Sequence, residues 1–274
     1  MKKIILFADD FGFSEGMNLG VIKACRQGVI TDINLIVNMT TSKDAVYLHS
    51  QYCPKIPMSA HINFVQGKPV SNPKEIPSLV DENGYFYRSY LWKSDDLEHS
   101  KAKGVIYPSK EDLYKETKAQ IIRFQELTGR MPCHFDAHSM MTEEMKKAFM
   151  KVGKEFNIHE PLENNEKDLY EVPMYTSSGR SVLNDGTEVN DFLEDRLNLL
   201  KSEHEINILH FHPGFIDEFI IENTSLILPR AKDLDTLCQP EIKKWIKEHF
   251  LITNIEKELS ESIRFRKTAE CQKI

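Results

Sequence analysis

Two adjacent carboxylates, Asp9 and Asp10, directly follow a short apolar run near the start of the chain. The run, residues 3–7, has no polar alternation, which is typical of a strand buried on both faces in a parallel sheet. Charged groups at the end of a buried strand need a partner. Either one carboxylate caps the next helix and the other is solvated, or Asp10 binds a metal ion while Asp9 acts as a general base.

Histidines recur where three later strand-like runs end: His61, His138 and His212. Functional side chains on parallel strands gather at the carboxyl ends of those strands, so we expect these imidazoles near the two aspartates. Two imidazoles and one carboxylate are a common catalytic metal set that leaves positions open for water and substrate. We therefore predict that Asp10, His61 and His138 bind one divalent ion, and that His212 is a general acid.

Further polar residues stand beside these candidates. Asp136 lies two residues before His138, on the same face of a strand, where a carboxylate can orient a ligand histidine. His134 shares that face but lies deeper, and we interpret it as a core residue. His210 shares a face with His212 and either supports it or is a buried polar residue. The remaining histidines are interpreted as surface residues: His49, His99, His159, His204 and His249.

Strand-like and helix-like segments alternate along the chain, which predicts βα units and a parallel sheet with right-handed crossovers. Such a sheet is either closed into a barrel or open and doubly wound, and 274 residues suit one barrel of about 250 residues. The predicted strands cover residues 3–7, 33–37, 58–64, 133–138, 171–175, 206–212 and 250–253. The predicted helices cover residues 15–27, 42–51 with Ser42 as its cap, 110–127, 142–156 with Thr142 as its cap, 191–202 and 240–249, with a short helix from about 255.

One stretch breaks this rhythm, from about residue 66 to 108. It contains several prolines and is too long for an ordinary loop, so we predict an insertion at the rim of the barrel. A second irregular stretch covers about residues 215–228. The insertion carries an aromatic cluster that either stacks on a ligand or forms a small core of its own: Tyr85, Phe86, Tyr87, Tyr90 and Trp92. We expect a single domain over residues 1–262 and a polar tail over 263–274.

Composition excludes several classes of partner. The formal net charge is −7 and the charges are mixed, without the basic patch of a nucleic-acid-binding protein. No segment approaches the roughly 20 apolar residues of a membrane span, and the first apolar run is too short for a signal peptide. The five cysteines are scattered without a CxxC pair, which is typical of reduced thiols. We expect a cytoplasmic protein that binds neither nucleic acid nor membrane.

Four motifs, taken together and in order, resemble those of the YdjC-like carbohydrate deacetylases. They are residues 7–12 with Asn18 following, residues 60–63, residues 134–138 and residues 212–214, and the likeness extends to a late Arg230 and residues 251–253. The resemblance implies an irregular (β/α) TIM-like barrel related to the polysaccharide deacetylases. It places the metal ligands of the family on Asp10, His61 and His138, the base on Asp9 and the acid on His212.

The resemblance also implies an activity: metal-dependent removal of acetyl from an N-acetylated sugar of the chitooligosaccharide type, neutral or phosphorylated. The ion is Mg²⁺ or Zn²⁺, the partner is a small carbohydrate, and a homodimer is possible. A backbone N–H near Gly12 is a candidate for stabilising the oxyanion. The third motif departs from the family, because Ser139, Met140 and Met141 replace its usual histidines and Ala137 replaces a small hydroxyl residue, which bears on substrate specificity. Three different functions also fit these residues: a metal-dependent phosphoesterase, a cyclic-amide hydrolase and a non-catalytic sugar-binding barrel.

Overall fold

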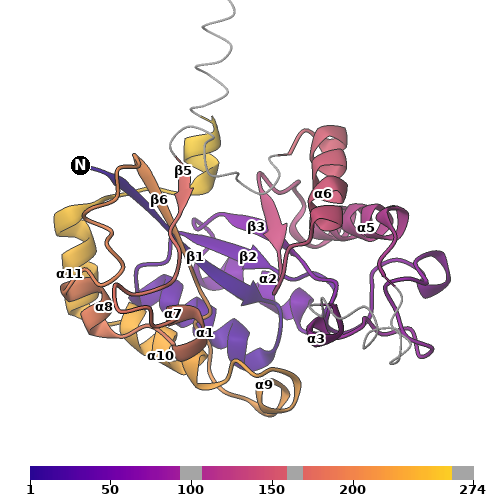
Figure 1. The fold of residues 1–274 in the computed structure, drawn as a ribbon, viewed down its shortest axis with the longest axis horizontal. Coiled ribbons are helices and arrows are strands. Elements are labelled where there is room, and N and C mark those ends of the chain that lie inside the picture. Colours follow the sequence, from indigo (N-terminus) through magenta and orange to yellow (C-terminus); the bar gives the residue numbers. More distant parts are fainter. Residues whose placement is uncertain (93–106, 159–168, 261–274) are drawn as a thin grey trace, which may run out of the picture.

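A curved parallel sheet flanked by helices forms the centre of the computed structural model, which describes residues 1–92, 107–158 and 169–260 (Figure 1). In these ranges, seven strands pair in the order β4-β3-β2-β1-β6-β5, with β7 beside the start of β1. The strands are β1 (Lys3–Phe11), β2 (Asp32–Leu35), β3 (Met58–Ile62), β4 (Phe135–Ala137), β5 (Leu169–Glu171), β6 (Ile206–Phe211) and β7 (Leu251–Ile252). Every pair is parallel, and the order follows the chain around an incomplete ring. The prediction of an irregular (β/α) barrel is confirmed.

Helices cover the outside of this half-barrel, with α5 and α6 on the side of β3 and α8 and α11 on the side of β6 (Figure 1). The helices are α1 (Glu15–Gln27), α2 (Ser42–Tyr52), α3 (Ser89–Trp92), α5 (Lys110–Thr128), α6 (Glu143–Phe156), α7 (Val182–Asp185), α8 (Val189–Leu193), α9 (Glu218–Asn223), α10 (Leu228–Leu237) and α11 (Pro240–His249), with a 3-10 turn η1 (Pro73–Glu75). Side-chain caps start three of the longer ones, from Ser14, Ser109 and Thr142. None of the helices in the described ranges is long and apolar enough to cross a membrane.

The central strand β1 is buried on both faces, which explains why its sequence shows no alternation. Ile4 and Leu6 pack in the large core between sheet and helices, whereas Ile5 and Phe7 belong to a second cluster with residues of β5 and β6. Ile255 joins this second cluster from the segment after β7. The ring of Phe7 stacks on His210 at 4.9 Å, so this inner cluster supports the polar residues above it.

Several predicted boundaries are wrong for local reasons. The helix expected over 191–202 stops with α8 at Leu193, because Asp195 and Asn198 adopt positive φ angles of 48° and 56° that no α-helix accommodates. The strand expected over 171–175 ends at Glu171, two residues before Pro173. Thr41, not Ser42, occupies the cap position of α2. The stretch expected to be irregular over 215–228 contains α9.

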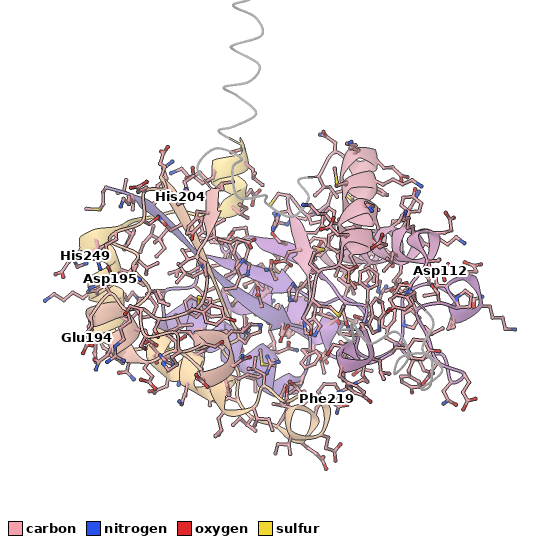
Figure 2. All side chains as sticks on the ribbon, viewed as in Figure 1. Asp112, Glu194, Asp195, His204, Phe219 and His249 are labelled. Carbon is pink, nitrogen blue, oxygen red and sulfur yellow. The ribbon has the colours of Figure 1, made fainter. Side chains whose placement is uncertain are left out.

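Buried carboxylates of α5 anchor the insertion. Glu116 accepts the backbone N–H groups of Val70 and Ser71, each at 2.9 Å. Asp112, labelled in Figure 2, accepts the N–H and the hydroxyl of Ser78 at 2.9 and 2.7 Å. The insertion is therefore tied to the barrel by charge-assisted hydrogen bonds.

The aromatic cluster of the insertion divides between the two roles expected for it. Phe86 and Trp92 both lie against Phe64, with ring centroids 6.4 Å apart in each case. Tyr85 and Tyr90 are exposed. The first pair joins the hydrophobic core, whereas the rings of the second pair are exposed and Tyr87 is half-buried.

Asp32, buried at the start of β2, predicts a pH-dependent stability. Its carboxyl accepts hydrogen bonds from Thr31 Oγ1 at 2.7 Å and from the backbone N–H of Ile255 at 3.0 Å, but burial raises its pKa to about 7. The folded state thus keeps a proton that the unfolded chain loses near pH 4, so this group's contribution to stability is lost as the pH rises from about 4 to about 7. Asp32→Asn should flatten the dependence of the unfolding midpoint on pH in thermal melts between about pH 4 and 7. The exposed Asp44→Asn is the control, and parallel profiles for wild type and Asp32→Asn would contradict the assignment.

Candidate active site

An irregularity at the end of β1 brings Asp9 and Asp10 to the mouth of the barrel. The pairing with β2 shifts register between Ala8 and Phe11, and Asp10 has a φ of 63°. Successive side chains of a regular strand point to opposite faces, whereas a bulge redirects one of them. Both carboxylates are almost completely buried, at 5% and 0% exposure. From the sequence we expected a turn after the strand that precedes Asp9. The structure instead has the irregularity within β1, which continues to Phe11.

The three predicted metal ligands converge. Asp10 from β1, His61 from β3 and His138 after β4 each offer a ligand atom, and these atoms lie within 4.8 Å of one another. Asp10 Oδ1 is 2.8 Å from His138 Nδ1 and 3.5 Å from His61 Nε2. One carboxylate oxygen and two imidazole nitrogens suit Zn²⁺ and similar divalent ions, so the residues present fit such an ion.

Two neighbouring residues orient this set. Asp136 Oδ1 lies 2.5 Å from Nδ1 of His61, which leaves Nε2 of that ring directed at Asp10. Arg230 donates from Nη1 to Asp10 Oδ2 at 2.7 Å and so leaves Oδ1 for the imidazoles. Side chains that hydrogen-bond a ligand imidazole or a ligand carboxylate are typical of metal centres. Asp136 and Arg230 both contact candidate ligands in this way.

Electrostatics keep Asp10 ionised despite its burial. Burial alone would raise the pKa of Asp10, but the charges of His138 and Arg230 hold it well below its usual range. For His61 the balance is reversed: burial alone would lower its pKa, and the adjacent carboxylates of Asp136 and Asp10 raise it well above the ordinary value. A site that stabilises a positive charge on His61 is a site that favours cations.

Asp9 is held by two residues. Asn34 donates from Nδ2 to Asp9 Oδ1 at 2.7 Å and to Asp136 Oδ2 at 2.8 Å, so one amide joins both carboxylates. His210 Nδ1 lies 3.0 Å from Asp9 Oδ2. Burial opposes ionisation of Asp9, but His210 keeps the pKa of Asp9 below its usual value, and Asp9 in turn raises the pKa of His210 to about 9 despite burial. The structure thus pairs His210 with the candidate base rather than with His212.

Asn34 was not among the predicted site residues. Its signal in the sequence is one polar residue within the apolar run of residues 33–37, at the strand next to β1. A fully buried amide in a strand needs hydrogen-bond partners. That requirement marks Asn34 as unusual, but only the structure identifies both acceptors.

Asp9, Asp136 and His210 form a second group whose ligand atoms lie within 4.8 Å of one another. Each of its carboxylate oxygens already has a partner on the protein: Asn34 and His210 for Asp9, and His61 and Asn34 for Asp136. A cation here would compete with three side chains that bind the two carboxylates: Asn34, His61 and His210. At Asp10 Oδ1 the hydrogen bond to be replaced is that of His138 Nδ1, itself a candidate ligand, while Arg230 keeps Oδ2.

His212 stands between two adjoining cavities. Its backbone N–H donates to Asp233 Oδ2 at 2.9 Å, which fixes the chain just after β6. The first cavity, of about 490 Å³, lies over Asp9, and the second, of about 640 Å³, extends past Asp10 toward the insertion. Burial lowers the pKa of His212, so its imidazole is neutral at neutral pH.

Met140, Met141 and Met150 line the first cavity with Leu183. The sequence departure from the family at residues 139–141 therefore gives this cavity a flexible apolar wall. A wall of this kind affects which substrate groups fit beside Asp9 and leaves the candidate metal ligands unchanged.

One expectation about the surroundings of the site is wrong, and another is narrowed. The N–H of Gly12 itself donates to Asn18 Oδ1 at 2.7 Å, so a backbone N–H for the oxyanion would have to come from another residue near Gly12. His49 is buried at 8% exposure, with Nε2 2.7 Å from the carbonyl oxygen of Ile56, because the end of α2 turns it inward. His134 is buried, as expected of a core residue.

The remaining histidines of the described ranges take no part in the site. His204 and His249 are half-buried and lie near the start of β6 and the end of α11, away from the barrel mouth (Figure 2). His99 and His159 lie outside the described residues.

The fold and the site define an irregular parallel barrel with carboxylates and imidazoles gathered at its mouth. The chain belongs to the YdjC-like protein family, whose model matches residues 3–248. It is 31% identical over 252 residues to carbohydrate deacetylase 2 of Listeria innocua, covering 90% of this chain and 94% of that relative. It is 28% identical over 264 residues to the chitooligosaccharide deacetylase of Serratia marcescens, covering 93% and 98% of the two chains.

A crystal structure from Enterococcus faecalis, of a protein described as a cellobiose-phosphate cleavage protein, shares this fold. The TM-score is 0.76 at 23% identity, and the match covers 93% of this chain and 98% of that one. At this level of identity the likeness concerns the fold alone.

The contact between Asp136 and His61 predicts a loss of metal affinity in Asp136→Asn. The amide cannot carry the charge that raises the basicity of His61, so affinity for Zn²⁺ should fall about 10- to 100-fold. Isothermal titration calorimetry measures it, with the exposed Asp235→Asn as the control. Equal affinities for wild type and Asp136→Asn would show that His61 does not depend on Asp136 for metal binding.

Proposed function

We propose that this protein is a metal-dependent carbohydrate N-deacetylase. The observation that carries the proposal is the convergence of Asp10, His61 and His138, with Asp9 held beside them at a cavity of about 490 Å³. Relatives of similar length are named carbohydrate and chitooligosaccharide deacetylases, which supports an N-acetylated sugar as the substrate.

Asp10, His61 and His138 would hold one divalent ion, Zn²⁺ or Mg²⁺. When bound, such an ion polarises an amide carbonyl and makes water a stronger nucleophile at neutral pH. Mixed oxygen and nitrogen ligands favour Zn²⁺, although availability of the metal also matters.

Asp9 would act as the general base. Its low pKa keeps it ionised, and the hydrogen bonds from Asn34 and His210 fix its orientation. Asp9 accepts a proton from the attacking water as the new C–O bond forms at the acetyl carbon. Asn34 and His210 position Asp9 and do not touch the reacting atoms.

His212 would deliver a proton to the leaving nitrogen. Its ring faces both cavities, and it makes no side-chain hydrogen bond within the described ranges. Because burial keeps it neutral at first, it must take up a proton from solvent in the adjoining cavity as negative charge develops at the adjacent carbonyl. The C–N bond then breaks, and the products are acetate and the free amino sugar.

The substrate class we propose is a small chitooligosaccharide. We further propose a cytoplasmic enzyme, with a homodimer as its possible assembly and without nucleic-acid or membrane partners. A metal-dependent phosphoesterase, the main competing enzyme class, favours two ions about 3.5–4 Å apart. The hydrogen bonds within the group of Asp9, Asp136 and His210 weigh against a second ion.

A cyclic-amide hydrolase and a non-catalytic sugar-binding barrel would also use a barrel of this kind. Neither Asp9 nor His212 belongs to the candidate ligand set, so a barrel that retains the ion only for stability has no use for them. Acetate release from N,N'-diacetylchitobiose separates the deacetylase from both of these functions. Hydrolysis of a phosphate ester or a cyclic amide without acetate release would favour the phosphoesterase or the cyclic-amide hydrolase.

The role of Asp9 predicts a separation of activity from metal binding. Asp9→Asn should lower the rate of acetate release roughly 10²- to 10⁴-fold, the usual contribution of a general base, while it retains the metal. His61→Ala should lose both metal and activity. Steady-state kinetics with metal content measured on the same samples tests both, and near-wild-type turnover in Asp9→Asn would exclude Asp9 as the base.

A further inference from the structure

The second cavity contains an arginine that the proposed mechanism does not use. This cavity, of about 640 Å³, adjoins the first through Ser139, Leu183 and His212, and Arg88 of the insertion lies in its wall. Its volume is within the usual range for ligand pockets. A substrate that reaches His212 from the first cavity can therefore extend toward Arg88.

Among the described residues, the guanidinium of Arg88 contacts only neutral acceptors. It donates from Nη1 to the side-chain oxygen of Gln66 and from Nη2 to the backbone carbonyl of Asn223. No carboxylate in the described ranges lies within ion-pair distance of it. Several arginines elsewhere do pair with carboxylates: Arg180 with Asp191, Arg196 with Glu194, and Arg230 with Asp10.

These two contacts hold the guanidinium in place. Gln66 is buried at 5% exposure, and its own side chain donates to Asn223 Oδ1 at 3.3 Å. A guanidinium has five N–H donors, so two bonds fix the group and leave others available. A half-buried, positioned guanidinium with spare donors is suited to the paired oxygens of a carboxylate or a phosphate.

The remaining charges at this cavity do not compensate Arg88. Asp10 and Arg230 pair with each other at 2.7 Å. Glu222 also lines the cavity, but it is exposed and makes no ion pair with Arg88. Tyr90, exposed at the same wall, offers a ring on which a sugar can stack.

We propose that Arg88 is a specificity-determining residue that binds an acidic group, phosphate or carboxylate, on a sugar substrate whose N-acetyl group lies at Asp9. This inference rests on the proposed deacetylase function and adds that the preferred substrate carries a negative charge. The acidic group lies on the part of the substrate in the second cavity, away from the bond that is hydrolysed.

The test compares three substrates in acetate-release kinetics: N,N'-diacetylchitobiose, its 6-phosphate, and a disaccharide of N-acetylglucosamine and glucuronic acid. The wild type should prefer one of the acidic sugars to the neutral one in kcat/KM, chiefly through KM. Arg88→Gln should reduce that preference about 10- to 100-fold, the contribution expected of charged hydrogen bonds. Arg88→Lys should retain part of it, and which acidic sugar is preferred distinguishes phosphate from carboxylate.

Arg123→Gln is the matched control, because Arg123 lies exposed on α5 and pairs with Glu126 at 2.8 Å. It should leave the preference unchanged. The inference would be overturned if the wild type had the same kcat/KM for the acidic and the neutral sugars. It would also be overturned if Arg88→Gln lowered kcat/KM equally for all three sugars, which would assign Arg88 a structural role between Gln66 and Asn223.

A failure of the deacetylase proposal remains distinguishable. If the wild type releases acetate from none of the sugars, calorimetry with N-acetylglucosamine 6-phosphate and N-acetylglucosamine tests Arg88 directly. Binding of the phosphate that weakens in Arg88→Gln supports the anion site without the activity. Binding that is absent, or equal in the two proteins, contradicts it.

Discussion

The carboxylate of Asp10 is the group on which the rest of this site depends. It is completely buried, and an uncompensated charge at that depth would cost several kcal/mol. Arg230 takes one of its oxygens, and His138 and His61 face the other. Any rearrangement that removed Arg230 would leave Oδ2 without its partner, and one that moved the end of β1 would separate the carboxylate from Arg230 and from both imidazoles. The bulge at Asp10, with its positive φ, is therefore part of the site as much as of the strand.

Around Asp10 the acidic and basic groups alternate, and this alternation keeps several buried charges compatible. Asp136 faces His61, and Asn34 lies between Asp136 and Asp9 as a neutral spacer. His210 compensates Asp9 on the other side and rests on the ring of Phe7. In this arrangement the neighbouring carboxylates accept hydrogen bonds from Asn34, His61 and His210, and we propose the cation beside Asp10, where two imidazoles face one oxygen. The same arrangement keeps Asp9 ionised and oriented, as a general base requires.

Much of this could be predicted from the sequence, because parallel strands bring their carboxyl ends to one edge. That rule sufficed to gather Asp9, Asp10, His61, Asp136 and His138, although Asp10 and His138 are 128 residues apart along the chain. The partner of His210 could not be predicted. Residues 210 and 212 share a face of the strand whether His210 pairs with His212 or with Asp9, and only the packing of β1 against β6 brings His210 to Asp9. The role of Asn34 could not be predicted for a similar reason, because one amide in an apolar strand has many possible acceptors.

Local features that depend on tertiary contacts were also missed. The periodicity of residues 191–202 is helical, but the left-handed conformations at Asp195 and Asn198 end the helix early. His49 resembles a surface residue of an amphipathic helix, and its burial follows from the carbonyl of Ile56 beyond the end of that helix. Arg88 gives no signal in the sequence, since its uncompensated charge is a property of the cavity that the insertion forms with the loop after α9.

The most direct test of this account is a crystal structure of the protein grown with Zn²⁺, with data collected at the zinc edge. The account predicts a single anomalous peak bonded to Asp10, His61 and His138, while Asp9 stays hydrogen-bonded to Asn34 and His210. A peak bonded instead to Asp9, Asp136 and His210, or no peak at a zinc concentration that saturates binding in solution, would contradict it.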